Sequence, residues 1–221
     1  GLHAIFTLLT QDIGYNPVNL LVYLPVSAFY IISMAFSYFG MRFLEESISD
    51  PIENTAGVIC VILFAVFMGD EFSALTWIAV AVITVGVLGV SFLENKGETP
   101  RKKKYGKTLA VVAFIMPFLY ALLDAFGTFL DDAFFLVEDI TATPLVDVTE
   151  ETIEAVANTS YELTFALFAL GLFLFMKAKK VKFGPIPQHK DKILAAVFET
   201  AGQFTYVYAL SGNGAIAAPI I

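Results

Sequence analysis

Carboxylates inside apolar segments are the residues of this chain with the clearest capacity for chemistry. Glu199 lies near the middle of such a segment, and Gln203 and Tyr206 follow it at helical positions i+4 and i+7, on one face. No Lys or Arg lies deep in any apolar segment to neutralise it. Because burial favours the neutral form of an unpaired carboxyl group, this face predicts a site that takes up and releases a proton. The alternative is a protonated Glu199 held by hydrogen bonds for packing alone.

A similar polar face lies in an earlier apolar segment. Tyr120 and Asp124 share it with Pro117, which removes one backbone N–H and therefore predicts a kink. Glu162 lies in the outer part of the next segment, which must cross in the opposite direction. We expect that Asp124 and Glu162 could meet and share a proton. The alternative is that one or both face water as ordinary polar residues.

Glu53 and Asn54 follow Pro51 at the inner end of another apolar segment. Free backbone N–H groups at a helix start stabilise a carboxylate, so the sequence supports both this structural role and contact with a substrate. A mild polar face in the preceding segment fits a cavity wall or hydrogen bonds between helices. Its members are Tyr30, Ser33 and Ser37.

Six apolar segments must position these residues, and they define the fold class. Each is about 18–24 residues long, the length that a helix needs to cross a hydrocarbon layer of about 30 Å. Hydrophobic residues make up 57% of the chain and charged residues 15%, against about 25% charged in soluble domains. The sequence therefore predicts an all-α, polytopic helical membrane protein. The six segments are residues 18–41, 51–69, 75–93, 108–130, 156–176 and 193–210.

The charged residues outside these segments differ between the two sides of the membrane. All 13 Lys and Arg residues fall in segments 42–50, 94–107 and 177–192, which alternating spans place on one face. The other face carries an acidic stretch at 131–155 that contains no basic residue. Because basic loops stay on the cytoplasmic side, we expect a multi-pass protein of the cell membrane with these three loops cytoplasmic. Basic residues at membrane edges do not indicate binding of nucleic acid.

Few residues could hold a cofactor. Cys60 is the only cysteine and lies inside an apolar segment, so disulfides and cysteine-based metal sites are excluded. His3 and His189 are isolated in the sequence, and the chain contains no nucleotide-binding motif. We therefore predict neither a metal nor a cofactor.

An internal repeat links the two halves of the chain. Residues 37–53 and 205–221 align at an offset of 168 positions, which pairs Pro51 with Pro219. The two copies cross the membrane in opposite directions if the spans alternate. This arrangement is an inverted-topology repeat, which is typical of secondary transporters.

Four landmarks follow one another in the first half of the chain. They are a helix end at 38–42, a proline turn at 48–52, Gly-Asp-Glu-Phe-Ser at 69–73 and Gly86 late in the next helix. Through them, residues 27–94 resemble an EamA-type repeat of the drug/metabolite transporter superfamily, whose acidic residue falls on Asp70 or Glu71. Residues 108–221 resemble most of a second copy.

This resemblance implies a ten-helix fold of two inverted EamA-like repeats, of which about six complete spans are present here. The chain would lack the first helices and the end of the second repeat. Residues 1–93 would be the remainder of the first repeat, 94–107 a basic cytoplasmic linker and 108–221 most of the second repeat. The implied function is secondary export or exchange of a small metabolite across the lipid bilayer, coupled to protons, by alternating access and without enzymatic activity.

Two other classes of protein remain open. A membrane-embedded enzyme acting on a lipid or diphosphate would use Asp124, Asp131 and Asp132 as an acidic cluster for a metal–diphosphate group, although their spacing matches no strong motif. A channel or passive structural subunit would need no titratable residue at membrane depth. The sequence selects neither the substrate nor the oligomeric state.

Overall fold

In the computed structural model, the regular elements of the described chain are all helices. The structure describes residues 1–95, 107–137, 139–181, 190–198 and 201–202. The chain divides into two compact units, which we describe separately. Within the described ranges, unit 1 contains residues 1–27 and those from 134 to 202, and unit 2 contains those from 28 to 133. The predicted all-α class is confirmed for the described ranges.

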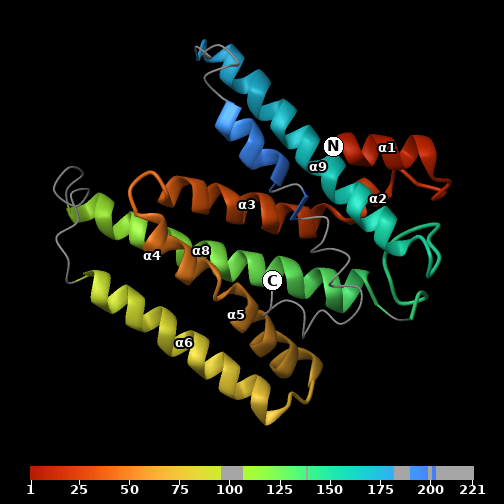
Figure 1. The fold of residues 1–221 in the computed structure, drawn as a ribbon. Coiled ribbons are helices and arrows are strands. Elements are labelled where there is room, and N and C mark those ends of the chain that lie inside the picture. Colours follow the sequence, from red (N-terminus) through yellow and green to blue (C-terminus); the bar gives the residue numbers. More distant parts are fainter. Residues whose placement is uncertain (96–106, 138, 182–189, 199–200, 203–221) are drawn as a thin grey trace. The chain divides into compact units, whose positions relative to one another are not determined.

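The helices are labelled along the chain in Figure 1. The elements of unit 2 are α3 (Leu24–Gly40), α4 (Glu46–Glu53), α5 (Ala56–Leu63), the π-helix η1 (Phe64–Met68), α6 (Ala74–Asn95), α8 (Lys107–Leu130) and the π-helix η2 (Asp131–Phe135). The first residues of α3 and the last of η2 belong to unit 1. Unit 1 also contains α1 (Leu2–Thr10), α2 (Asn19–Val22) and α9 (Ile153–Ala178). Residues 190–198 and 201–202 are helical as well.

Three helices in the described ranges are long and apolar enough to cross a membrane: Ile48–Met68, Val111–Phe135 and Ile153–Ala178. By length and composition, they confirm three of the six predicted spans and the membrane-protein class. Leu24–Gly40 and Ala74–Val87 are apolar helices of shorter described length, within the predicted spans 18–41 and 75–93. The predicted span 193–210 falls mostly outside the described residues.

The predicted span 18–41 is interrupted at Tyr23, between α2 and α3. Pro25 provides the physical reason, because it has no N–H to donate to the carbonyl oxygen of Leu21. Its ring also restricts the backbone of the residue before it. Hydropathy alone does not register such an interruption, since proline and its neighbours remain apolar.

The prediction that residues 42–50 form a loop is wrong for its second half, because α4 begins at Glu46. Ile48 and Ile52 lie one turn apart on α4 and are 8% and 0% exposed. The helix is therefore stabilised by burial of one apolar face. Pro51 lies inside α4, in the first turn of the candidate span Ile48–Met68.

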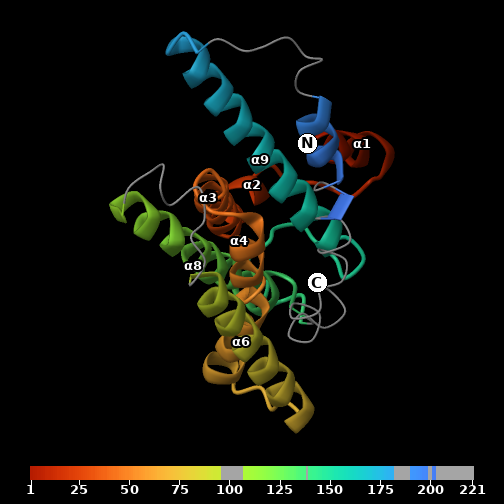
Figure 2. The ribbon, with the colours of Figure 1, turned by 60° about the vertical axis from the view of Figure 1, so that its left-hand side comes forward.

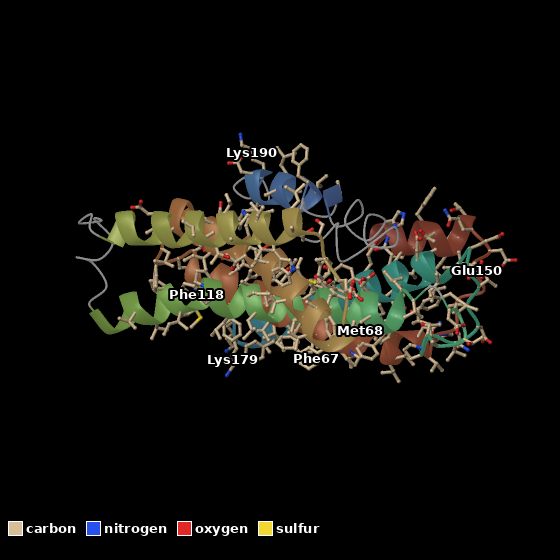
Figure 3. All side chains as sticks on the ribbon, turned by 90° about the horizontal axis from the view of Figure 1, so that it is seen from below. Phe67, Met68, Phe118, Glu150, Lys179 and Lys190 are labelled. Atoms are coloured by element: carbon tan, nitrogen blue, oxygen red, sulfur yellow. The ribbon has the colours of Figure 1, made fainter. Side chains whose placement is uncertain are left out.

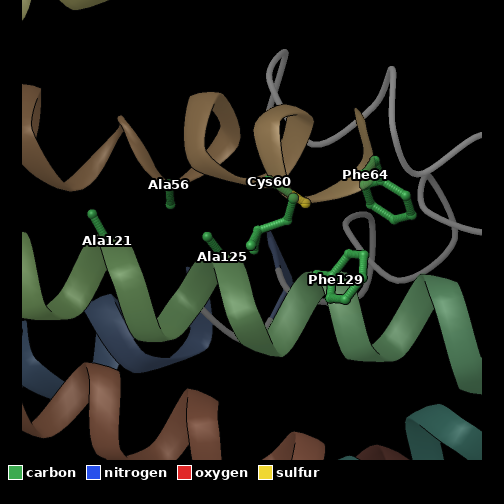
Figure 4. Packing of buried hydrophobic residues seen from close by; sticks show 7 residues of the cluster. Ala56, Cys60, Phe64, Ala121, Ala125 and Phe129 are labelled. Atoms are coloured by element: carbon green, nitrogen blue, oxygen red, sulfur yellow. The ribbon is translucent and has the colours of Figure 1, made fainter. Parts of the chain in front are cut away.

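The core of unit 2 is the parallel packing of α5 and η1 against α8. The contact residues recur at every fourth position on both sides, so that one residue per turn meets the partner helix. Because the contacts advance in the same order along both helices, the helices run in the same direction. Alanine side chains end at Cβ and let the two backbones approach closely, as in other membrane helix pairs. The row consists of Ala56, Cys60 and Phe64 facing Ala121, Ala125 and Phe129 (Figure 4).

α3 runs antiparallel to α8, and a glycine permits close approach near each end of the contact. A Cβ atom on Gly40 would lie 3.1 Å from the Cβ of Met116. A Cβ atom on Gly127 would lie 3.3 Å from the Cβ of Phe29. With α3 antiparallel and α5 parallel to α8, the three helices have the relative directions that successive crossings of a membrane require.

One end of unit 2 is acidic, and the other carries Arg42 together with Glu45, Glu46 and Asp50. Asp70, which follows η1, interacts electrostatically with Asp132 in η2, so the C-terminal ends of the two spans lie close together. Arg42 follows Gly40, which packs near the start of α8, and therefore lies toward the other end. α6 contacts α4 and α5 and completes this group of helices (Figure 2).

In unit 1, α1 and α2 pack against α9. Asn19, at the start of α2, fastens the stretch between η2 and α9. Its Nδ2 donates to the carbonyl oxygen of Val146 at 2.8 Å, and its Oδ1 accepts from the N–H of Val146 at 2.8 Å. The exposed side chains of Glu150 and Lys179 lie beyond opposite ends of α9 (Figure 3). α9 thus separates an acidic from a basic end of unit 1.

Replacing Gly127 by Val tests the contact between α3 and α8. The added side chain would meet Phe29 and the ring of Tyr30, both 3.3 Å from the Cβ position. Overpacking of this kind costs about 1–3 kcal/mol. We expect a lower melting temperature of the purified protein in detergent. Gly86→Val is the matched control, because no other helix of the described chain lies within 4 Å of its Cβ position. Equal melting temperatures of the two variants would contradict the described packing.

Replacing Asn19 by Ala tests how the stretch before α9 is held. The change removes both hydrogen bonds to Val146, and an unpaired buried polar group costs about 1–3 kcal/mol. We expect faster cleavage between residues 139 and 152 in limited proteolysis and a lower melting temperature. Asn16→Ala is the control, since its bond to Asp147 is exposed. The rate of cleavage should be higher in Asn19→Ala than in Asn16→Ala, and identical rates would contradict the role of Asn19.

Candidate functional site

Glu53 accepts two hydrogen bonds inside the span Ile48–Met68. The hydroxyl of Ser37, on α3, donates to its Oε2 at 2.8 Å, and the hydroxyl of Ser49 donates to its Oε1 at 2.7 Å. Ser37 is 5% exposed and Ser49 is fully buried. Two helices therefore supply donors to a single carboxylate within a candidate membrane span.

The predicted role of Glu53 at a helix start is wrong, because this residue ends α4. A carboxylate at the C-terminal end of a helix faces the negative end of the helix dipole. Backbone N–H groups at a helix start therefore do not stabilise it, and the two serine hydroxyls do so instead. Asn54 is exposed and contributes no hydrogen bond to Glu53 in the described structure.

The span Ile48–Met68 is irregular directly after Glu53. The helical pattern of hydrogen bonds tightens at Thr55, whose N–H donates to the carbonyl oxygen of Ile52 at 3.1 Å. The hydroxyl of Thr55 donates to the same oxygen at 2.6 Å. α5 then resumes at Ala56, and the π-helix η1 follows at Phe64. Local departures from α-helical geometry inside a span are often found at functional sites.

Asp124 lies on α8, next to Ala125 of the core row. α8 packs against α4 and α5, and the carboxylate of Asp124 interacts electrostatically with Glu53 and with Cys60. Asp124 is surrounded by protein atoms, yet part of its surface remains accessible. No described residue forms a hydrogen bond or ion pair with it. Glu53 and Asp124 are thus two carboxyl groups on packed helices, here called the carboxylate pair. Only Glu53 has bonded donors in the described structure.

Tyr120 lies one turn before Asp124 on α8. It is partly buried and packs against the core row. The predicted shared face of Tyr120 and Asp124 is therefore directed toward the interior of unit 2. Pro117 lies within the same helix and is almost completely buried.

Glu162 has a different environment, in unit 1. Its Oε1 is hydrogen-bonded to Nδ1 of His3 at 2.9 Å, and its Oε2 accepts from the N–H of Ala4 at 3.0 Å. Glu162 is 6% exposed. His3, which is isolated in the sequence, pairs in the structure with a carboxylate on α9. Asp124 belongs to unit 2, so the predicted meeting with Glu162 stays a prediction.

A second polar contact joins α9 to the chain between α1 and α2. The hydroxyls of Tyr15 and Ser160 are hydrogen-bonded at 3.0 Å. Burial raises the pKa of Tyr15, and the hydrogen bond to Ser160 opposes this rise. The phenol therefore stays protonated near neutral pH and contributes a neutral polar contact.

The remaining predicted site residues fall into two groups. Glu199, Gln203 and Tyr206 lie outside the described residues. Of the acidic cluster considered for an enzyme, Asp131 is 1% exposed and Asp132 is partly buried. In the described ranges, no group of three or more His, Cys, Asp or Glu residues could hold a metal ion.

Comparison with known proteins gives no relative: no protein-family model, curated protein or solved structure matches this chain. The resemblance to an EamA-type repeat therefore depends on the sequence landmarks alone. Sequence analysis missed Ser49 and His3 as partners of Glu53 and Glu162. The relation of Ser49 to Glu53 at i and i+4 is a readable signal once a helix is assumed there. His3 and Glu162 are 159 positions apart, so no local pattern could link them.

Proposed function

We propose that this protein is a secondary transporter that exports or exchanges a small metabolite, with Glu53 and Asp124 at its substrate and proton site. The observation that carries the proposal is the carboxylate pair on two neighbouring candidate spans. Neither span contains a Lys or Arg to neutralise it. A charged carboxylate near the centre of a membrane helix costs about 2.5–3.5 kcal/mol. Asp124 lies near the middle of Val111–Phe135, whereas Glu53 lies near the start of Ile48–Met68. Such residues commonly mark pathways for substrates, ions or protons.

The surroundings of the pair support a binding role over a purely structural one. Two serine hydroxyls hold Glu53 in a fixed orientation. Asp124 keeps accessible surface and has no hydrogen bond from the described residues. A carboxylate that only stabilised helix packing would be expected to have its oxygen atoms paired, as those of Glu162 are.

Protons are the coupling ion in this proposal. Burial and a like charge nearby both favour the neutral form of a carboxyl group, so the pair is suited to take up a proton when no substrate is bound. The tightened turn after Glu53 and the π-helix η1 are places where the span could bend between two conformations. The protein would alternate access to the site by such movements.

Within the class of secondary transporters, we propose a drug/metabolite transporter of EamA type with two inverted repeats. The landmarks in residues 27–94 support it, and so do the relative directions of α3, α5 and α8. We place segments 42–50, 94–107 and 177–192 on the cytoplasmic side of the cell membrane, because they hold all 13 Lys and Arg residues. Glu199, with Gln203 and Tyr206, remains the candidate for a corresponding site in the second repeat.

The test is proton movement in liposomes that contain the purified protein. Internal pH is recorded while pools of small metabolites are added under an imposed pH gradient. We expect saturable, pool-dependent proton movement that falls at least about tenfold in Glu53→Gln and Asp124→Asn, which corresponds to a barrier increase of about 1.4 kcal/mol. Glu150→Gln should leave it unchanged, because Glu150 is exposed outside the spans.

Three other outcomes would revise the proposal in different ways. Unchanged proton movement in both Glu53→Gln and Asp124→Asn would contradict the assignment of these two residues to the site. Loss in Glu199→Gln alone would place proton coupling in the second repeat. Absence of saturable movement with every pool would contradict coupled transport.

A further inference from the structure

We propose that the C-terminal end of α9 binds the headgroup of an anionic phospholipid, with Lys177 and Lys180 as the charged contacts. The inference goes beyond the proposed transport function and does not depend on it. It requires only that α9, which contains one of the three candidate spans, crosses a membrane. The site lies where the apolar part of this helix ends.

The first observation is positive charge that no described group neutralises. Lys177, Lys179 and Lys180 are exposed at the end of α9, and residues 163–190 contain no Asp or Glu. Neither Lys177 nor Lys180 forms a side-chain hydrogen bond or ion pair within the described ranges. Basic clusters directly beside a membrane helix attract anionic lipids. A phosphodiester headgroup would supply the negative charge that the chain itself does not.

The second observation is that the end of α9 is closed by backbone hydrogen bonds. The N–H of Lys180 donates to the carbonyl oxygen of Lys177 at 3.0 Å. The N–H of Val181 donates to the carbonyl oxygen of Met176 at 3.0 Å. These two bonds form a Schellman motif. Lysine side chains at a helix end often satisfy such carbonyl groups; because backbone N–H groups do so here, the ammonium groups remain available to an external partner.

The third observation concerns the backbone of Lys180. Its φ is 57°, in the left-handed region where a Schellman motif usually places glycine. A residue with a Cβ atom is disfavoured in this region, so Lys180 makes the end of α9 less stable than glycine would. Strained residues of this kind cluster at functional sites. The side chain of Lys180 therefore suits a role outside the helix itself.

The fourth observation identifies the partner as a lipid. Residues 167–175 of α9 are all apolar and all exposed in the described chain. Lys179 directly follows this stretch, and its Nζ lies 5.7 Å from the centroid of the Phe175 ring. Positive charge thus begins where the apolar surface ends, which matches a phospholipid whose acyl chains adjoin a negative headgroup. A soluble anion lacks the apolar part, and a zwitterionic lipid carries a cation of its own.

The experiment measures lipid binding to the purified full-length protein in detergent by native mass spectrometry. Dioleoylphosphatidylglycerol is the anionic probe, and dioleoylphosphatidylcholine has the same acyl chains without net charge. We expect saturable binding of phosphatidylglycerol, with an affinity at least about tenfold higher than that of phosphatidylcholine. Equal affinities would overturn the proposal. Inorganic phosphate at the same concentration should not displace phosphatidylglycerol, and displacement would overturn a lipid as the ligand.

Two double variants remove equal charge at different places. Lys177→Gln combined with Lys180→Gln should weaken phosphatidylglycerol binding at least about tenfold. Lys102→Gln combined with Lys103→Gln, in the basic segment 94–107, is the matched control and should leave binding nearly unchanged. Equal losses in both double variants would indicate diffuse attraction to basic segments and contradict a site on α9. Size-exclusion profiles show whether each variant is folded.

The single variant Lys180→Gly separates lipid binding from helix stability. Glycine adopts the left-handed backbone without strain, so the melting temperature without lipid should rise. The affinity for phosphatidylglycerol should fall at the same time, because the variant lacks one of the two charges. A higher melting temperature with unchanged lipid affinity would show that Lys180 is no lipid contact and would overturn its assignment.

Discussion

The close parallel approach of α5 to α8 is the constraint on which the rest of unit 2 depends. It is possible because Ala56, Ala121 and Ala125 add little volume between the two backbones. α4 continues directly into α5, so this contact also brings Glu53 within electrostatic reach of Asp124. A bulkier residue in the row would separate the helices and the two carboxylates together. The packing of α5 against α8 and the positions of the two carboxylates therefore depend on the same small residues.

The carboxylates of the two units differ in their hydrogen-bond partners. In unit 1, Glu162 is paired with His3 and with the N–H of Ala4, so both its oxygen atoms have partners. In unit 2, Glu53 has two serine donors, whereas Asp124 has none in the described structure. An unpaired buried polar group costs about 1–3 kcal/mol or more. This difference is the physical reason for assigning a stabilising role to Glu162 and a binding role to the pair.

The helices that the sequence predicted most accurately are those with long, uninterrupted apolar stretches. α8 and α9 extend only a few residues beyond the predicted spans 108–130 and 156–176, because hydropathy over a full crossing length is a strong physical requirement. The first part of α4, residues 46–50, was predicted as a loop, because its residues are mostly polar and the burial of Ile48 is not visible in the sequence. The site was predicted in part: Glu53 and Asp124 were candidates, but their proximity depends on helix packing that one sequence does not encode locally. Pairing of His3 with Glu162 escaped prediction for the same reason.

A double-mutant cycle tests most directly whether Glu53 and Asp124 form one site. The free energy of unfolding is measured in detergent at neutral pH for the unmodified protein, Glu53→Gln, Asp124→Asn and the double variant. Residues that interact directly show a coupling of about 0.5–3 kcal/mol, whereas independent residues add within about 0.3–0.5 kcal/mol. We predict a coupling above about 0.5 kcal/mol, because neutralising Glu53 removes a like charge that acts on Asp124. Strict additivity would contradict the shared site and the function built on it.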